Sequence, residues 1–271
     1  MHDAKLKAQK TYNAAADFFD DPALAFWDRF GRGTIDRLNL VPGNWVLDVC
    51  SGTGASALPA AIQVGPTGRV VAVDLAENLL ALAEEKAHQL GLSNLEIQVG
   101  DIDALNYAPE FDAVVIVFGI FFLPDMTAAT MGLWRMVKPS GQLAVTTWGP
   151  RLWEPGSSIF WNAVNDLRPD LTRVYNPWDS LTDPDAVRNL LLSAGAVDVH
   201  VEAVRGSHPL RSPDDFWNIV LGSGYRATHD AMTPDEQLAV RSRVIDSLAW
   251  RNITSVETNV VFATATKSRF S

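Results

Sequence analysis

Two glycines after an apolar run are the first sign of chemistry in this chain. Residues 46–58 read VLDVCSGTGASAL: an apolar run carrying Asp48, a Gly52-x-Gly54 turn, then small residues. A strand that leads into a glycine-rich turn and then a helix brings backbone N–H groups close to a ligand. Asp74 ends the next apolar run, roughly twenty residues further on, where a carboxylate can accept hydrogen bonds from both hydroxyls of a ribose. The spacing predicts a site for a nucleoside-containing cofactor.

The residues around this turn follow a pattern of alternating strands and helices. Strands are expected at the apolar runs 46–49, 70–73, 95–99, 113–118 and 143–147. Helical patterns lie between them, at about 55–62, 77–90 and 127–137. Strands that are apolar along their length and alternate with helices indicate a parallel sheet covered on both faces. The expected class is α/β, with the glycine turn and Asp74 at the carboxyl ends of neighbouring strands.

The character of the chain changes after Gly149. Residues 150–180 are rich in proline and tryptophan, and a helix at 183–194 and a strand at 197–204 are expected to follow. Ser212 and Thr233 each precede a proline and acidic residues, which is typical of helix starts. Two helices are therefore expected before a last strand at 259–267. We predict a single domain over 1–271, with an N-terminal helical lid (1–40), a cofactor-binding core (41–149), cap segments (150–180 and 206–257) and segments that complete the sheet (181–205 and 258–271).

Composition excludes several classes of function. The net charge is −10, so the chain lacks the basic surface that nucleic acids or anionic membranes attract. Cys50 is the single cysteine, and the histidines are scattered, so neither a disulfide within the chain nor a metal site is expected. The first residues lack the apolar core of a signal peptide, and the longest apolar stretch, 113–124, is too short to span a bilayer. We expect a cytoplasmic protein, monomeric or homodimeric, without nucleic-acid or membrane partners.

Four motifs in order resemble those of class I S-adenosylmethionine-dependent methyltransferases, in the ubiquinone/menaquinone-biosynthesis-like (type 11) branch. The motifs are Asp48-x-Cys50-x-Gly52-x-Gly54, in which Cys50 replaces the first glycine of the family pattern, then Asp74, Gly100-Asp101, and Phe111–Gly119 with its continuation to Gly141. Their joint occurrence over roughly residues 10–150 is far more specific than any one of them. The resemblance implies a Rossmann-like sheet of seven mostly parallel strands, in the order 3-2-1-4-5-7-6 with the seventh antiparallel, helices on both faces and a helical cap.

The resemblance also implies S-adenosyl-L-methionine as the cofactor and a role for each motif. The methionine end would lie on the Gly52–Gly54 backbone, with Asp48 near its ammonium group. Asp74 would hold the ribose, and Asp101 would face the adenine amino group. The full expected cofactor-binding set is Tyr12, Asp48, Cys50, Ser51, Gly52, Thr53, Gly54, Asp74, Leu75, Leu79, Gly100, Asp101, Ile102 and Phe118.

Two alternatives stay open. Gly52-x-Gly54-x-x-Ala57 also fits the relaxed dinucleotide fingerprint, which would make the protein an NAD(P)-dependent oxidoreductase. Two residues argue against that interpretation. Asp48 places a charge inside the strand, where a dinucleotide-binding strand has no use for one. Asp101 places a carboxylate at the end of the third strand, where an adenine would need a hydrogen-bond acceptor. The second alternative is a protein that binds S-adenosylmethionine or S-adenosylhomocysteine without catalysis, since no base on the acceptor side is evident.

The methyl acceptor is expected to be a small, apolar or aromatic molecule. The segment after the fourth strand lacks the Asn/Asp-Pro-Pro-Tyr/Phe tetrad of methylases that act on nucleic-acid and protein amides, and many aromatic residues lie in the segments expected to cover the cofactor. His208 follows the sixth strand and is the candidate general base. The expected acceptor-binding residues are Phe121, Phe122, Trp148, Trp217, Tyr225 and His229.

Overall fold

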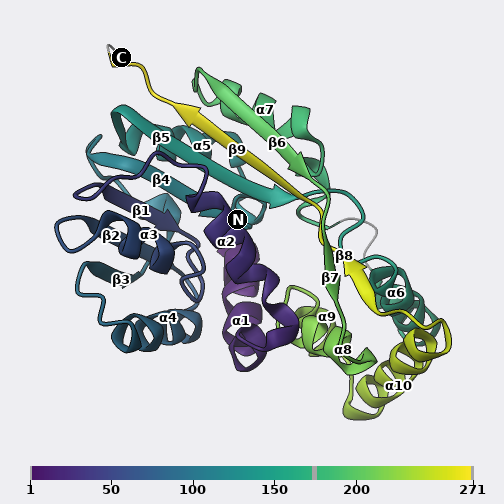
Figure 1. Cartoon of the computed structure of the whole chain (residues 1–271). Coiled ribbons are helices and arrows are strands. Elements are labelled where there is room, and N and C mark those ends of the chain that lie inside the picture. Colours follow the sequence, from purple (N-terminus) through teal and green to yellow (C-terminus); the bar gives the residue numbers. More distant parts are fainter. Residues whose placement is uncertain (1, 173–175, 270–271) are drawn as a thin grey trace.

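A twisted sheet forms one half of the molecule (Figure 1). The computed structural model describes residues 2–172 and 176–269; residues 173–175, within the expected cap segment 150–180, lie outside the described residues. The seven sheet strands are β1 (Trp45–Val49), β2 (Arg69–Asp74), β3 (Leu95–Val99), β4 (Phe111–Val117), β5 (Val137–Trp148), β6 (Val199–Val204) and β9 (Val260–Thr266). Their order is β3-β2-β1-β4-β5-β9-β6, and β9 is antiparallel to β5 and β6. The expected fold class, strand order and antiparallel last strand are confirmed.

Alternate side chains of the strands pack on opposite faces of the sheet. Val46 points to the face covered by α3 (Ala57–Val64), whose small residues allow close approach. Leu47, its neighbour in β1, belongs to the larger cluster on the other face, together with Leu133 of α5 (Met126–Met136). Because both faces are covered, the strands are apolar along their length, as the sequence pattern indicates.

Further helices complete the layers. α4 (Glu77–Gln89) connects β2 to β3, and α7 (Pro184–Ser193) packs on β6 and β9. The helix expected at 183–194 and the strand expected at 197–204 are both confirmed. The helix is one residue shorter at each end, and the strand begins two residues later.

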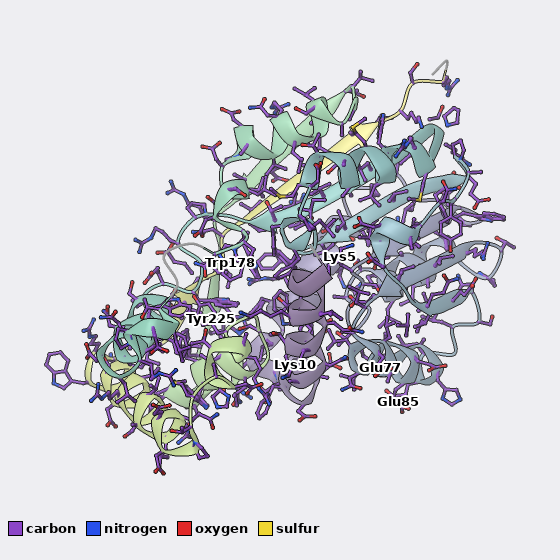
Figure 2. All side chains as sticks on the ribbon, turned by 180° about the vertical axis from the view of Figure 1, so that it is seen from behind. Lys5, Lys10, Glu77, Glu85, Trp178 and Tyr225 are labelled. Atoms are coloured by element: carbon purple, nitrogen blue, oxygen red, sulfur yellow. The ribbon has the colours of Figure 1, made fainter. Side chains whose placement is uncertain are left out.

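Two N-terminal helices lie between the sheet with its covering helices and the helices that follow β6. α1 (His2–Phe19) contacts α4 on one side and α8 (Pro213–Leu221) and α9 (Arg226–His229) on the other. Figure 2 shows this position: Glu77 and Glu85 of α4 lie to one side of α1, and Trp178 and Tyr225 lie to the other. α2 (Phe26–Ile35) follows and packs on α3 and β5.

The cap has more regular structure than the sequence pattern indicates. Between β6 and β9 the structure has three helices, α8, α9 and α10 (Pro234–Trp250), where two were expected. It also has a two-stranded antiparallel ribbon of β7 (Ser207–Pro209) and β8 (Ser255–Glu257). The resemblance implies cap helices after the fifth strand, and α6 (Gly156–Leu167) is such a helix; it lies in the proline- and tryptophan-rich stretch, where the sequence pattern indicated no bounds for it, and it packs on α10 (Figure 1). α6, α8, α9, α10 and the ribbon are called the cap below.

Within residues 2–172 and 176–269, no helix combines the length and the apolar character that crossing a bilayer requires. The same residues hold no group of three histidine, cysteine or acidic side chains that could bind a metal ion.

Candidate functional site

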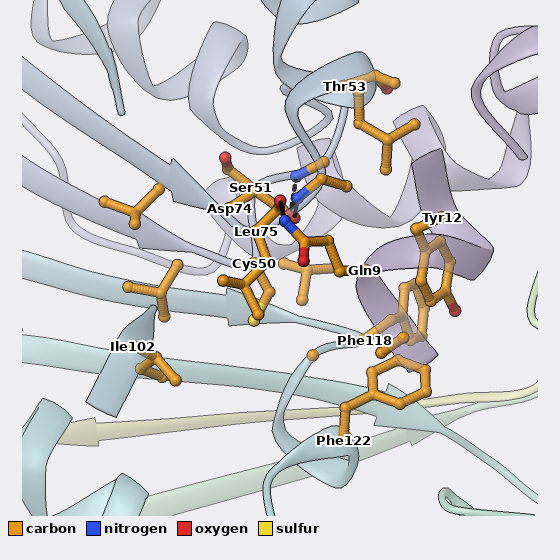
Figure 3. Close-up of a pocket in the computed structure, with 18 of the residues that line it drawn as sticks. Gln9, Tyr12, Cys50, Ser51, Thr53, Asp74, Leu75, Ile102, Phe118 and Phe122 are labelled. Atoms are coloured by element: carbon orange, nitrogen blue, oxygen red, sulfur yellow. Dashed lines mark hydrogen bonds between the residues drawn. The ribbon is translucent and has the colours of Figure 1, made fainter. Parts of the chain in front are cut away.

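A cavity opens at the carboxyl ends of β1, β2 and β4, under α1 (Figure 3). Twelve residues of the expected site line it: Tyr12, Cys50, Ser51, Gly52, Thr53, Asp74, Leu75, Leu79, Gly100, Ile102, Phe118 and Phe122. They come from seven separate parts of the chain, and the parallel strands bring most of them to one edge of the sheet. The lining also includes residues outside the expected set of site residues: Lys5, Ala8, Gln9, Phe19, Trp27, Val49, Ala55, Ser56, Val73, Ala76, Val117, Gly119 and Leu123.

The turn after β1 has the left-handed backbone that its glycines allow. Gly52 has φ +52° and Gly54 has φ +84°, so an L side chain would be strained at either position. Cys50 takes φ +55° in spite of its side chain. The chain thus turns sharply at the end of β1 and leads into α3.

Asp74 holds this turn to the end of β2. One carboxylate oxygen accepts the N–H of Gly52 at 2.9 Å, and the other accepts the N–H of Ala76 at 2.8 Å. Burial raises the pKa of Asp74, and the backbone N–H groups of Ala76 and Gly52 oppose that rise because they stabilise the carboxylate. A carboxylate fixed in this way and lining the cavity has lone pairs left for the two hydroxyls of a ribose.

Three buried polar atoms near the turn have no partner among the described residues. They are Asp48 Oδ1, Ser51 Oγ and Thr53 Oγ1. The other oxygen of Asp48 accepts the hydroxyl of Ser56 at 2.7 Å. Unpaired buried polar groups are costly, so a ligand that pairs them gains affinity. An amino acid end with one ammonium and one carboxylate suits this set, because Asp48 attracts the ammonium and the hydroxyls can donate to the carboxylate.

Asp48 is also poised to respond to pH. Burial, with a smaller contribution from the nearby charge of Asp74, raises its pKa to about 7, although the Ser56 hydroxyl opposes the shift. Near neutral pH the carboxyl is therefore partly protonated, and an ammonium group at Oδ1 favours the ionised form.

We expect the affinity for S-adenosylhomocysteine to fall as the pH decreases below about 7, by at most about tenfold per pH unit, since binding must then release one proton from Asp48. Asp48→Asn should bind more weakly at pH 8 and lose this part of the pH dependence. Calorimetry at several pH values, in buffers of different ionisation enthalpy, measures both the affinity and the released proton. The same pH slope in wild type and Asp48→Asn would contradict the assignment.

The other end of the cavity carries a charged contact between α1 and the loop after β3. The ammonium of Lys5 lies 2.6 Å and 2.9 Å from the two carboxylate oxygens of Asp101, and it also pairs with Asp103. Nearby, the side-chain amide of Gln9 donates to the carbonyl oxygen of Leu75 at 2.8 Å. Gly100 and Ile102 line the cavity, whereas Asp101 faces an adjoining groove that Lys5 also lines.

Aromatic rings surround the opposite end, where Figure 3 shows Tyr12, Phe118 and Phe122 together. Tyr12 packs edge-to-face on Phe122, with 5.5 Å between ring centroids. Trp27 stacks on Phe19 at 5.1 Å and meets Phe118 edge-to-face at 5.5 Å. The faces and edges of these rings line an apolar space beside the glycine turn.

Eight of the expected site residues do not line the cavity: Asp48, Gly54, Asp101, Phe121, Trp148, Trp217, Tyr225 and His229. Trp148 stacks on Phe118 at 3.9 Å, so it supports a lining residue from behind. Tyr225 is buried in the cap, where its hydroxyl hydrogen-bonds that of Ser157 at 2.7 Å. Trp217 and His229 pack on each other, 5.7 Å apart, also in the cap. Their roles toward an acceptor stay predictions.

His208, the candidate base, is also outside the lining. It lies in the β7–β8 ribbon, buried, with its ring edge-to-face on Phe26 at 5.1 Å. Burial and the nearby charge of Arg29 lower its pKa, which keeps the ring neutral. These contacts are those of a packed structural side chain.

Comparisons with known proteins agree with this geometry. The model of the ubiE/COQ5 methyltransferase family matches residues 9–155. Nocamycin O-methyltransferase of Saccharothrix syringae is 27% identical over 253 residues, which cover 88% of this chain and 89% of that protein. Demethylmenaquinone methyltransferase of Oceanobacillus iheyensis is 36% identical over 113 residues. These residues cover 41% of this chain and 48% of that enzyme, so the match spans about half the length of this relative.

Among solved structures, phosphoethanolamine N-methyltransferase 2 of Haemonchus contortus, in complex with phosphomonomethylethanolamine and S-adenosylhomocysteine, superposes with a TM-score of 0.60. The match covers 98% of this chain and 60% of that one at 20% identity, and at this identity it shows the shared fold alone.

Proposed function

Since the chain belongs to the ubiE/COQ5 methyltransferase family, we propose that it transfers the methyl group of S-adenosylmethionine to a small apolar or aromatic acceptor. The protein is an S-adenosylmethionine-dependent methyltransferase, and its relatives point to a small organic acceptor. The observation that carries the finer proposal is the ring-lined end of the cavity, formed by Tyr12, Phe118 and Phe122. We further propose that the lid, core and cap work as one domain.

Residues in the cavity and Asp48 beside it would suit the cofactor in one direction. Asp48, Ser51 and Thr53 would hold the methionine end, because their unpaired atoms match an ammonium and a carboxylate. Asp74 would bind the ribose hydroxyls. Gly100 and Ile102, which both line the cavity, would border the adenine. Figure 3 shows Ile102 away from the aromatic rings of Tyr12, Phe118 and Phe122. This direction places the reactive sulfur beside Phe118.

S-adenosylmethionine supplies an electrophilic methyl group on a positively charged sulfur. Phe118 and Trp27 can stabilise that positive charge through their ring faces. Tyr12, Phe19 and Phe122 exclude water and can orient a flat acceptor, which lets the two reactants meet in line. The net charge of −10 favours a neutral or cationic acceptor over a polyanion.

A two-part experiment tests the proposed function. Calorimetry with S-adenosylmethionine, S-adenosylhomocysteine and NAD should show micromolar-class binding of the first two and no binding of NAD. Transfer of a labelled methyl group to a panel of small phenols, enols, quinols and amines should then label at least one acceptor. Tight binding of NAD alone would contradict the cofactor assignment. Binding without any labelled product, across a panel that also includes peptides and RNA, would favour a non-catalytic binder.

We expect Phe122→Ala to raise KM for the acceptor about tenfold and to change the affinity for S-adenosylhomocysteine by less than about twofold. The side chain is partly buried and lines the cavity beside Tyr12, and truncating such an aromatic contact removes roughly 1–3 kcal/mol of packing. Steady-state kinetics and calorimetry separate the two effects. An equal loss of cofactor affinity would place Phe122 on the cofactor instead.

Replacing His208 tests whether the reaction uses a base. Because His208 packs on Phe26 and does not line the cavity, we expect His208→Gln to lower the unfolding temperature while kcat changes by less than about twofold. A large fall in kcat, with stability and cofactor affinity intact, would support His208 as the base.

A further inference from the structure

Lys5 stands between the cavity and Asp101. It lines both the cavity and the adjoining groove, whereas Asp101 lines only the groove. Its ammonium contacts both carboxylate oxygens of Asp101, at 2.6 Å and 2.9 Å, and its side chain is only 13% exposed. The carboxylate expected to accept the adenine amino group is thus already engaged by a cation that belongs to the chain itself.

We propose that the ammonium of Lys5 competes with the adenine amino group for the carboxylate of Asp101. Lys5 then occupies the adenine subsite in the free protein and is displaced when the cofactor binds. The inference rests on the proposed function and adds a residue to which no role has been given. An ammonium and an amino group are both N–H donors, so one can replace the other at the same oxygen. Lys5 retains a second partner, Asp103, which can hold its charge once Asp101 is taken.

The attachment of α1 makes such a displacement local. Further along the helix, Asn13 is bound at two points to Asn78 of α4, through contacts of 3.0 Å and 3.1 Å. Asp20, just after α1, pairs with Lys86 of α4 at 2.9 Å. Gln9 donates to the carbonyl oxygen of Leu75 at 2.8 Å, so α1 is held from Gln9 onward, and the displacement would be confined to the residues before it, around Lys5.

The charge and length of residue 5 provide a graded test. Lys5→Met removes the competing cation but keeps an unbranched side chain of similar length. We expect this variant to bind S-adenosylhomocysteine about two- to fivefold more tightly than wild type, because a partly exposed ion pair contributes little free energy. Lys5→Arg should bind more weakly than wild type, since a guanidinium can engage both carboxylate oxygens at once. Lys7→Met is the matched control, because Lys7 is exposed on the same helix and has no ion pair among the described residues.

The dependence of the affinity on salt concentration distinguishes the effect of the charge of Lys5 from the effect of the shape of its side chain. Titrations at about 0.02 M and about 0.5 M NaCl should show the gap between wild type and Lys5→Met closing at high salt, because screening weakens the Lys5–Asp101 pair. Hydrogen exchange of the wild type should rise in the first turns of α1 when S-adenosylhomocysteine is added, and stay unchanged from Asn13 onward.

Each other outcome has a distinct meaning. Weaker binding by Lys5→Met would show that Lys5 holds the ligand and would overturn the proposal. Equal binding by Lys5→Met and wild type at both salt concentrations would overturn it as well. If neither wild type nor any variant binds S-adenosylhomocysteine while all are folded, the proposed function fails, and the competition has no ligand to act on.

Discussion

Asp74→Ala should reduce the affinity for S-adenosylhomocysteine by roughly a hundredfold or more. The carboxylate lines the cavity, and its removal would take away the two charge-assisted hydrogen bonds that we propose it makes to the ribose, each contributing about 1.5–3 kcal/mol. It also releases the N–H groups of Gly52 and Ala76, so the glycine turn loses its attachment to β2. Calorimetry or equilibrium dialysis measures the loss directly.

Two further variants make this result specific. Asp74→Asn keeps one carbonyl oxygen but loses the charge, so its affinity should fall between those of wild type and Asp74→Ala. Glu77→Gln neutralises a carboxylate that is exposed in the first turn of α4 and should bind like wild type. An Asp74→Ala protein that binds within threefold of wild type would remove Asp74 from the site, provided that circular dichroism shows the fold unchanged.

Gly119→Ala should destabilise the protein by about 1–3 kcal/mol or more, the cost of overpacking a filled interior. A Cβ at this position would lie 2.5 Å from the Cβ of Cys50 and 2.7 Å from its sulfur. The two residues follow neighbouring strands, β1 and β4, and both line the cavity. The substitution should therefore weaken cofactor binding as well as stability.

A second substitution should rescue the first. Cys50→Gly removes the clashing atoms, and glycine accepts the left-handed φ of +55° at that position without strain. The double variant Cys50→Gly, Gly119→Ala should recover most of the lost stability in urea unfolding. Gly132→Ala is the control, because its nearest contact is 4.0 Å away and alanine favours the helix. A double variant no more stable than Gly119→Ala alone would show that the clash is not with Cys50.

The sheet and the glycine turn could be predicted because their signals are local. The apolar runs, the Gly52-x-Gly54 spacing and Asp74 each occupy a few consecutive residues, and parallel strands then bring their carboxyl ends together. The family resemblance supplied the strand order, which periodicity alone does not determine.

The lid and the cap depend on contacts that no local pattern reveals. Lys5 and Asp101 are 96 positions apart, and nothing around either residue indicates the other. Helix α6 begins at Gly156, a poor helix former, and a Cβ there would lie 2.3 Å from the ring of Phe216, so the glycine is needed for close packing on α8. Tyr225 and Trp217 were expected at the acceptor because they are aromatic, yet aromatic side chains also fill the small interior of a cap.

The position of β9 has a consequence for how the chain can fold. β9 pairs with β5 and β6 on its two sides, yet in sequence it follows the whole cap. Until Val260–Thr266 has been synthesised, β5 lacks its neighbour on one edge, and β6 lacks its partner in the sheet. The sheet is therefore completed last, when β9 is inserted between β5 and β6. A nascent chain that stops within the cap presents unpaired strand edges, which a chaperone can cover.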